Sequence, residues 1–124
     1  MARILILSEN SDDLAMYNLI LERQGYDCIT CTTLENARSY LQNSDIDVLY
    51  IVGFHYFGRD GLEFYERLKS DTELCKIPVI IYTPWWPSTL KLNPSDFGDT
   101  LFVMPMSIRD FVEKVKELTG HKVE

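Results

Sequence analysis

Few side chains in this chain have the types and spacing needed for chemistry, and the most regular spacing is the C-x-x-C formed by Cys28 and Cys31. A redox pair of this kind requires a turn and a helix start, so that the two thiols can meet. The surrounding "YDCITCTT" is rich in β-branched residues, which predicts a strand with the two thiols on opposite faces. We therefore expect buried structural thiols here, and Cys75, beside Lys76, is the candidate for a more reactive thiol.

The loop "GFHYFGRDG" places one histidine, His55, among the aromatic residues Phe54, Tyr56 and Phe57. An imidazole can serve as a base or a ligand, but no cysteine or second histidine lies nearby in the sequence, so no metal site is predicted. We interpret His55 as a hydrogen-bonded loop residue and His121, in the C-terminal "HKVE", as a solvated one.

Five short apolar runs alternate with amphipathic stretches along the chain. They cover residues 4–7, 28–31, 48–52, 79–82 and 101–104. Such alternation predicts parallel strands joined by right-handed helical crossovers. The run at 48–52 has no polar face, which is typical of a central strand covered on both sides. In such sheets, ligands and chemistry usually lie just past the carboxyl ends of the strands.

Capping signals between the runs predict where the helices begin and end. Ser11, followed by two aspartates, is the predicted N-cap of the first helix, and Thr32 has capping-box spacing from Glu35 for the second. The other boundary signals are Gly25 after the first helix, Asp60 before the third, and Ser107 and Gly120 around the last. The fourth crossover, "TPWWPSTLKLNPSDFGD", contains three prolines, so at most one short helix is expected there.

Composition limits the class of protein. A chain of 124 residues with 46% hydrophobic content is long enough for one domain with its own core, which we place at residues 1–124. Its net charge of −7 disfavours binding to nucleic acid or to an anionic membrane surface. An odd count of three cysteines, with no signal peptide or membrane-length apolar run, predicts a cytoplasmic protein.

Five phrases, taken in order, span nearly the whole chain: they are "RILILSEN", "QGYDCITC", "DGLEFYERLKSD", "KIPVIIYT" and "FVMPMSIRDFVEKVKEL". In their order and near-normal spacing they resemble the receiver domains of two-component response regulators. The resemblance implies a flavodoxin-like (βα)5 three-layer fold with a five-stranded parallel sheet of order 2-1-3-4-5. The fourth helix would be shortened or irregular, and no effector domain is expected after the receiver-like part.

A phosphorylatable receiver uses an aspartate at the end of its third strand as the nucleophile. The resemblance puts that position on Val52 when aligned from Asp47, or on Gly53 when aligned backward from "DG". Neither residue can form an acyl phosphate.

The other parts of the family's pocket are also altered. The acidic pair that holds a divalent ion falls on Ser8 and Glu9, so at best Glu9 is vestigial and Mg²⁺ binding is expected to be weak or absent. The lysine of the fifth strand is replaced by Met104, and only Thr83 keeps its family role as a possible phosphate donor. We therefore predict a pseudo-receiver, not an enzyme, that takes up no phosphoryl group and acts by protein contact or self-association.

The candidate interaction residues are aromatic. Trp85 and Trp86 lie where receivers usually have the fourth helix, and Phe102 lies in the fifth strand. In the family this region is the usual face for dimerisation and output, and tryptophan is enriched at binding hot spots. The tryptophans would alternatively cover the emptied pocket. Phe54, His55 and Tyr56 are expected to pack over the place that phosphate would occupy.

Two alternative functions remain open. A true receiver with an unusual phosphoacceptor would use a residue such as Asp60 or Glu9. A flavodoxin-like small-ligand or flavin binder would need a phosphate-donating loop after the first strand, whereas "SENSDD" contains three acidic residues that repel phosphate.

Overall fold

The computed structural model describes residues 2–53, 57–83, 101–103 and 107–120. Within these ranges, five strands form one parallel sheet in the order β2-β1-β3-β4-β5, as predicted. The strands are β1 (Arg3–Leu7), β2 (Asp27–Cys31), β3 (Val48–Val52), β4 (Val79–Thr83) and β5 (Leu101–Val103). The helices are α1 (Ser11–Arg23), α2 (Leu34–Asn43), α3 (Gly58–Ser70) and α4 (Ile108–Thr119), with a 3₁₀ turn, η2, at Leu74–Lys76.

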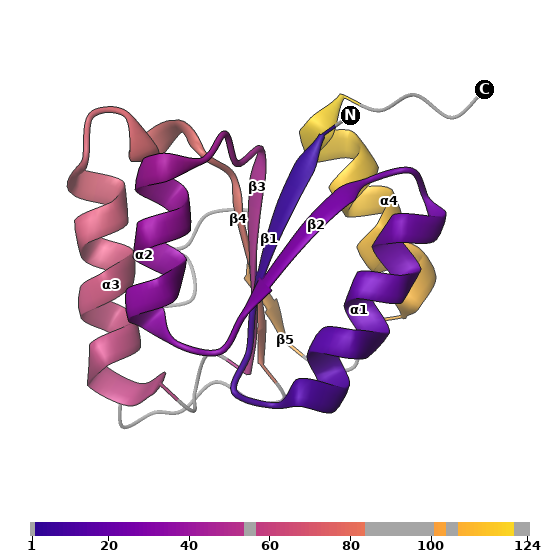
Figure 1. Cartoon of the computed structure of the whole chain (residues 1–124), viewed down its shortest axis with the longest axis horizontal. Coiled ribbons are helices and arrows are strands. Elements are labelled where there is room, and N and C mark those ends of the chain that lie inside the picture. The colour runs from indigo at the N-terminus through magenta and orange to yellow at the C-terminus, as the bar shows by residue number, and fades with distance from the viewer. Residues whose placement is uncertain (1, 54–56, 84–100, 104–106, 121–124) are drawn as a thin grey trace.

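Helices cover both faces of the sheet, which gives the three layers of a flavodoxin-like fold. Figure 1 shows α2 and α3 on one side of the sheet and α1 and α4 on the other. Every residue of β3 is buried, because this strand lies in the middle of the sheet with helices on both sides. The predicted fourth helix, in residues 84–100, lies outside the described residues.

Alternation along the strands divides the core into two clusters. Leu49 and Ile51 of β3 belong to the cluster beneath α2 and α3, whereas Val48, Tyr50 and Val52 belong to the cluster beneath α1 and α4. Successive residues of a strand point to opposite faces, so each crossover helix finds an apolar surface to cover.

Two predicted helix caps are wrong by one residue. Asn10, not Ser11, caps α1, because its backbone is extended and its side chain accepts hydrogen bonds from the amides of Asp12 (2.9 Å) and Asp13 (3.2 Å). Thr33 rather than Thr32 caps α2, and its hydroxyl accepts from the amide of Asn36 at 3.1 Å. In both cases the cap is the last residue with an extended backbone.

The other helix boundaries agree better with the prediction. Ser107 caps α4 by accepting from the amide of Asp110 at 3.0 Å, and Gly120 ends that helix with φ of 69°. Gly25, with φ of 91°, follows α1. The third helix was expected to follow Asp60, but α3 begins at Gly58 and includes it. Among the described residues, no helix is both long enough and apolar enough to cross a membrane.

Candidate functional site

The register of the strands brings the predicted pocket residues to one edge of the sheet. Leu7 of β1 pairs with Ile51 of β3, so Ser8 and Val52 are the next residues on neighbouring strands. Val52 in turn pairs with Tyr82 of β4, whose carbonyl accepts a hydrogen bond from the amide of Gly53 at 2.7 Å. This carboxyl edge is where parallel α/β sheets usually hold their ligands.

Val52 is a packing residue in this structure. It is the last residue of β3, its side chain is 4% exposed, and it belongs to the same core cluster as Tyr50 and Phe111. Gly53 follows with φ of 73°, a left-handed conformation that favours glycine. The strand therefore ends with an aliphatic side chain that faces the core.

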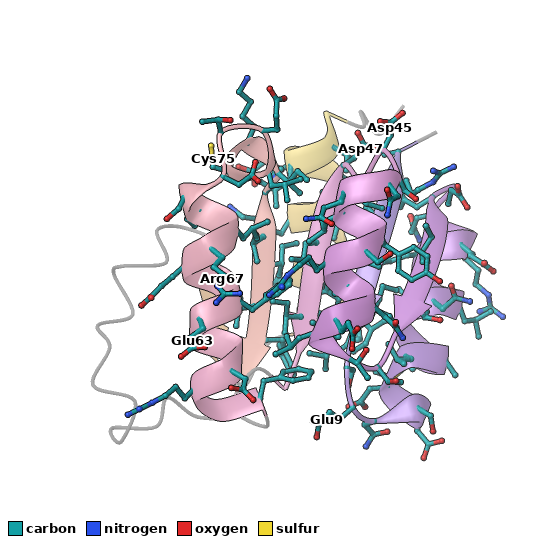
Figure 2. All side chains as sticks on the ribbon, turned by 60° about the vertical axis from the view of Figure 1, so that its left-hand side comes forward. Glu9, Asp45, Asp47, Glu63, Arg67 and Cys75 are labelled. Carbon is teal, nitrogen blue, oxygen red and sulfur yellow. The ribbon has the colours of Figure 1, made fainter. Side chains whose placement is uncertain are left out.

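Ser8 is buried and hydrogen-bonded, whereas Glu9 is exposed. The Ser8 hydroxyl oxygen accepts from the amide of Asn10 at 3.1 Å, and the Ser8 amide donates to the carbonyl of Cys31 at 3.1 Å. The Ser8 residue is 2% exposed. Glu9 points outward at this edge of the sheet, as Figure 2 shows. Ser8 thus supports the turn into α1, and Glu9 is an exposed carboxylate at this edge of the sheet.

The remaining predicted residues are not placed by the structure. Phe54, His55, Tyr56, Trp85, Trp86, Met104 and His121 lie outside the described residues, and Thr83 and Phe102 belong to strands but their side chains are not described. By register, Thr83 pairs with Val103 of β5 at the same edge.

The structure also reveals an aromatic cluster beneath the site that sequence reasoning missed. Tyr50 is fully buried, with its ring centroid 4.9 Å from that of Tyr17 in an edge-on contact and 4.4 Å from that of Phe111. Tyr82, on β4, packs against the same cluster. Burial is the main cause of a raised pKa at all three tyrosine hydroxyls, and the negative charge of Asp13 adds to the rise at each.

The hydroxyl of Tyr50 is the unusual feature of this cluster. It is buried and makes no hydrogen bond to any described residue. The nearest hydroxyl is that of Tyr17, and a weak interaction between the two hydroxyls raises the pKa of Tyr50 and lowers that of Tyr17, although the pair does not meet the geometry of a full hydrogen bond. The available sequence signal was a tyrosine inside an otherwise aliphatic strand. A buried hydroxyl without a partner lowers the stability of the folded state.

The three thiols are free, and the strand interpretation of the C-x-x-C is confirmed. Cys31 belongs to the core beneath α2 and α3, while Cys28 packs against the opposite core. Burial raises the pKa of Cys28 to about 12 and that of Cys31 to about 11, so both remain protonated thiols at neutral pH. Cys75 is exposed at the opposite edge of the sheet from Glu9, as Figure 2 shows, and so lies away from the candidate site.

No metal-binding cluster was found in the described part of the chain. None of its His, Cys, Asp and Glu side chains form a group of three or more with the geometry to hold an ion. Asp60 is exposed in the first turn of α3. Weak or absent Mg²⁺ binding stays a prediction.

No known family model matches the chain, and a search of known proteins finds sequence similarity to a transcriptional regulator. The phosphate regulon transcriptional regulatory protein PhoB of Pseudomonas aeruginosa is 26% identical over 114 residues. The match covers 91% of this chain and 49% of PhoB, so the chain spans about half the length of that relative.

Solved structures share the fold over nearly the whole chain. A sensor protein from Polaromonas sp. JS666 superposes with a TM-score of 0.81 at 16% identity, covering 96% of each chain. The response regulator protein TrrA of Thermotoga maritima, solved in complex with the histidine kinase ThkA, gives 0.76 at 21% identity, covering 95% of this chain and 98% of TrrA. The chain therefore has the fold of response regulator receiver domains.

Proposed function

We propose that this chain is a receiver-type domain of two-component signalling that accepts no phosphoryl group and acts through protein contacts. The shared fold, the similarity to half of PhoB and the five ordered receiver-like phrases support the assignment to two-component signalling. The altered pocket supports the absence of phosphorylation. We place the protein in the cytoplasm, where such signalling domains meet their partners.

The observation that carries this proposal is the burial of Val52 at the end of β3. A phosphoacceptor must present a carboxylate to solvent and to a divalent ion, whereas Val52 is 4% exposed and packs in the core. Ser8, at the position of a metal-binding acid, uses its hydroxyl oxygen to accept from the amide of Asn10. A single exposed carboxylate, Glu9, is a poor site for Mg²⁺, which prefers several hard oxygen ligands.

Incubation with acetyl phosphate and Mg²⁺, followed by intact-mass measurement, tests the absence of phosphorylation. We expect no adduct, while a receiver domain that retains its strand-end aspartate, run in parallel, should gain about 80 Da. An adduct of that mass on this chain would overturn the proposal. Glu9→Gln and Asp60→Asn would then show which of the two alternative acceptors carries it.

A protein partner is the remaining part of the proposal. TrrA, which shares this fold, was solved bound to a histidine kinase, and this supports a protein partner in a signalling pathway. Self-association with a second copy of the chain is the alternative. We assign the contact to the aromatic residues Trp85 and Trp86. A pull-down comparing the native chain with Trp85→Ala and Trp86→Ala, each checked for folding, should show loss of partner. Unchanged partners in both variants would remove the tryptophans from the proposal.

A further inference from the structure

A pocket of about 220 Å³ lies between α2 and α3, on the face of the sheet away from the tyrosine cluster. Its apolar floor is formed by Leu41 of α2 and by Phe64 and Leu68 of α3, all at most 4% exposed. Two guanidinium side chains, Arg38 of α2 and Arg67 of α3, also line it. Figure 2 shows Arg67 on α3, one turn from Glu63.

Neither arginine has an anionic partner among the described residues. The ion pairs among the described residues join Arg3 to Asp27, Arg109 to Glu113 and Lys114 to Glu117. The chain has 19 acidic and 12 basic residues, so carboxylates are abundant. Both arginine residues are exposed at the surface, so their guanidinium groups can contact an anion that enters the pocket.

The acidic residue of the pocket limits the charge of that anion. Asp71 lines the same pocket, and its carboxylate oxygen Oδ1 accepts hydrogen bonds from the amides of Glu73 (2.8 Å) and Leu74 (2.9 Å). These two bonds lower the pKa of Asp71, so it is ionised at neutral pH. A fixed negative charge opposes a dianion such as phosphate more strongly than a monoanion.

We propose that this pocket binds a small monocarboxylate with an apolar body, such as an aromatic acid. The planar guanidinium of each arginine matches the geometry of a carboxylate, and the leucine and phenylalanine floor receives the carbon skeleton. The pocket is smaller than the usual range of about 300–1,000 Å³ for drug-sized ligands, which restricts the ligand to roughly the size of one ring. The site uses none of the residues behind the proposed signalling function, and each proposal stands or falls without the other.

Titration of the isotope-labelled chain with benzoate, monitored by NMR, tests the site directly. We expect saturable shifts at the backbone amides of Leu41, Leu68 and Leu74 and at the side-chain Nε–H groups of Arg38 and Arg67. Benzamide has the same ring without the charge, and inorganic phosphate has charge without the ring. Both should bind at least about tenfold more weakly than benzoate, because each lacks one of the two matched features.

Substitution of each arginine distinguishes binding at this pocket from nonspecific attraction of benzoate to positive charges on the protein. Arg38→Gln and Arg67→Gln should each weaken benzoate binding about tenfold or more, while Arg23→Gln, an exposed arginine on α1, should leave it unchanged. Arg67→Lys keeps the charge but loses the planar guanidinium, so its affinity for benzoate should lie between those of the native chain and Arg67→Gln. This intermediate affinity distinguishes loss of the ligand contact from misfolding of the glutamine variants.

Three results would overturn the proposal. They are equal binding of benzamide, tighter binding of phosphate than of benzoate, or an equal loss in the Arg23→Gln control.

Discussion

Replacing Tyr50 by phenylalanine is expected to stabilise the protein, although it removes a polar group from the middle of the core. The Tyr50 side chain is fully buried and its hydroxyl has no hydrogen-bond partner among the described residues. An unsatisfied buried hydroxyl costs about 1–3 kcal/mol. The substitution keeps the ring, and with it the contacts to Tyr17 and Phe111.

The loss that opposes this gain is small. Removing one oxygen leaves a void of roughly 10 Å³, which at about 24 cal/mol per Å³ costs about 0.2 kcal/mol. We therefore expect Tyr50→Phe to raise the free energy of unfolding by about 1–2 kcal/mol. Urea denaturation followed by circular dichroism measures this as a higher midpoint with an unchanged slope.

Tyr26 provides a matched control for the same chemical change. It is 4% exposed, but its hydroxyl lies 2.9 Å from the hydroxyl of Thr119. Tyr26→Phe should therefore lower the free energy of unfolding by about 1 kcal/mol. The reasoning is refuted when Tyr50→Phe destabilises the protein as much as Tyr26→Phe does, because the hydroxyl of Tyr50 must then have an effective partner, such as the hydroxyl of Tyr17 or a buried water.

Three further changes test the cap, the end of the central strand and the buried thiols. Asn10→Ala should cost about 1 kcal/mol of stability by removing the cap of α1, whereas Ser11→Ala should cost less than about 0.5 kcal/mol; the reverse order in urea melts would show that the cap is misassigned. Val52→Asp should cost about 3 kcal/mol or more by burying a carboxylate, and a loss no larger than that of Val52→Ala would disprove the packed environment. Because burial raises the pKa of Cys28 to about 12 and of Cys31 to about 11, the stability that the two thiols contribute is fully present below their ordinary value of 9.0 and is lost as the pH rises toward 11–12. Urea melts at a series of pH values across this window should show a smaller fall in the free energy of unfolding for a Cys28→Ala/Cys31→Ala variant than for the native chain. The same dependence of the free energy of unfolding on pH in both proteins would contradict the raised pKa values.

The sheet could be predicted closely because strand formation here depends on local apolar runs. The run at 48–52 matches β3 residue for residue, and the strand order implied by the receiver resemblance is the observed one. The C-x-x-C could also be interpreted correctly, since β-branched neighbours make residues 28–31 a strand and a strand keeps the two thiols on opposite faces.

The caps were harder to predict because adjacent residues of similar chemistry compete for the same role. Asn10 and Ser11 can both cap a helix, and the choice depends on which residue keeps an extended backbone as the chain leaves β1. The same competition explains why Thr33, and not the predicted Thr32, caps the second helix.

The sequence by itself determined which side chains lie at the carboxyl ends of the central strands: an aliphatic Val52 at the end of β3 and an uncharged Ser8 directly after β1 follow from the order of residues alone. Only the tertiary structure decided that the Tyr50 hydroxyl lacks a partner and that Arg38 and Arg67 share a pocket. The physical reason is that residue type and periodicity are local properties of the chain. The hydrogen-bond and charge partners of a side chain come from segments that are distant in sequence and become neighbours through packing of the helices on the sheet.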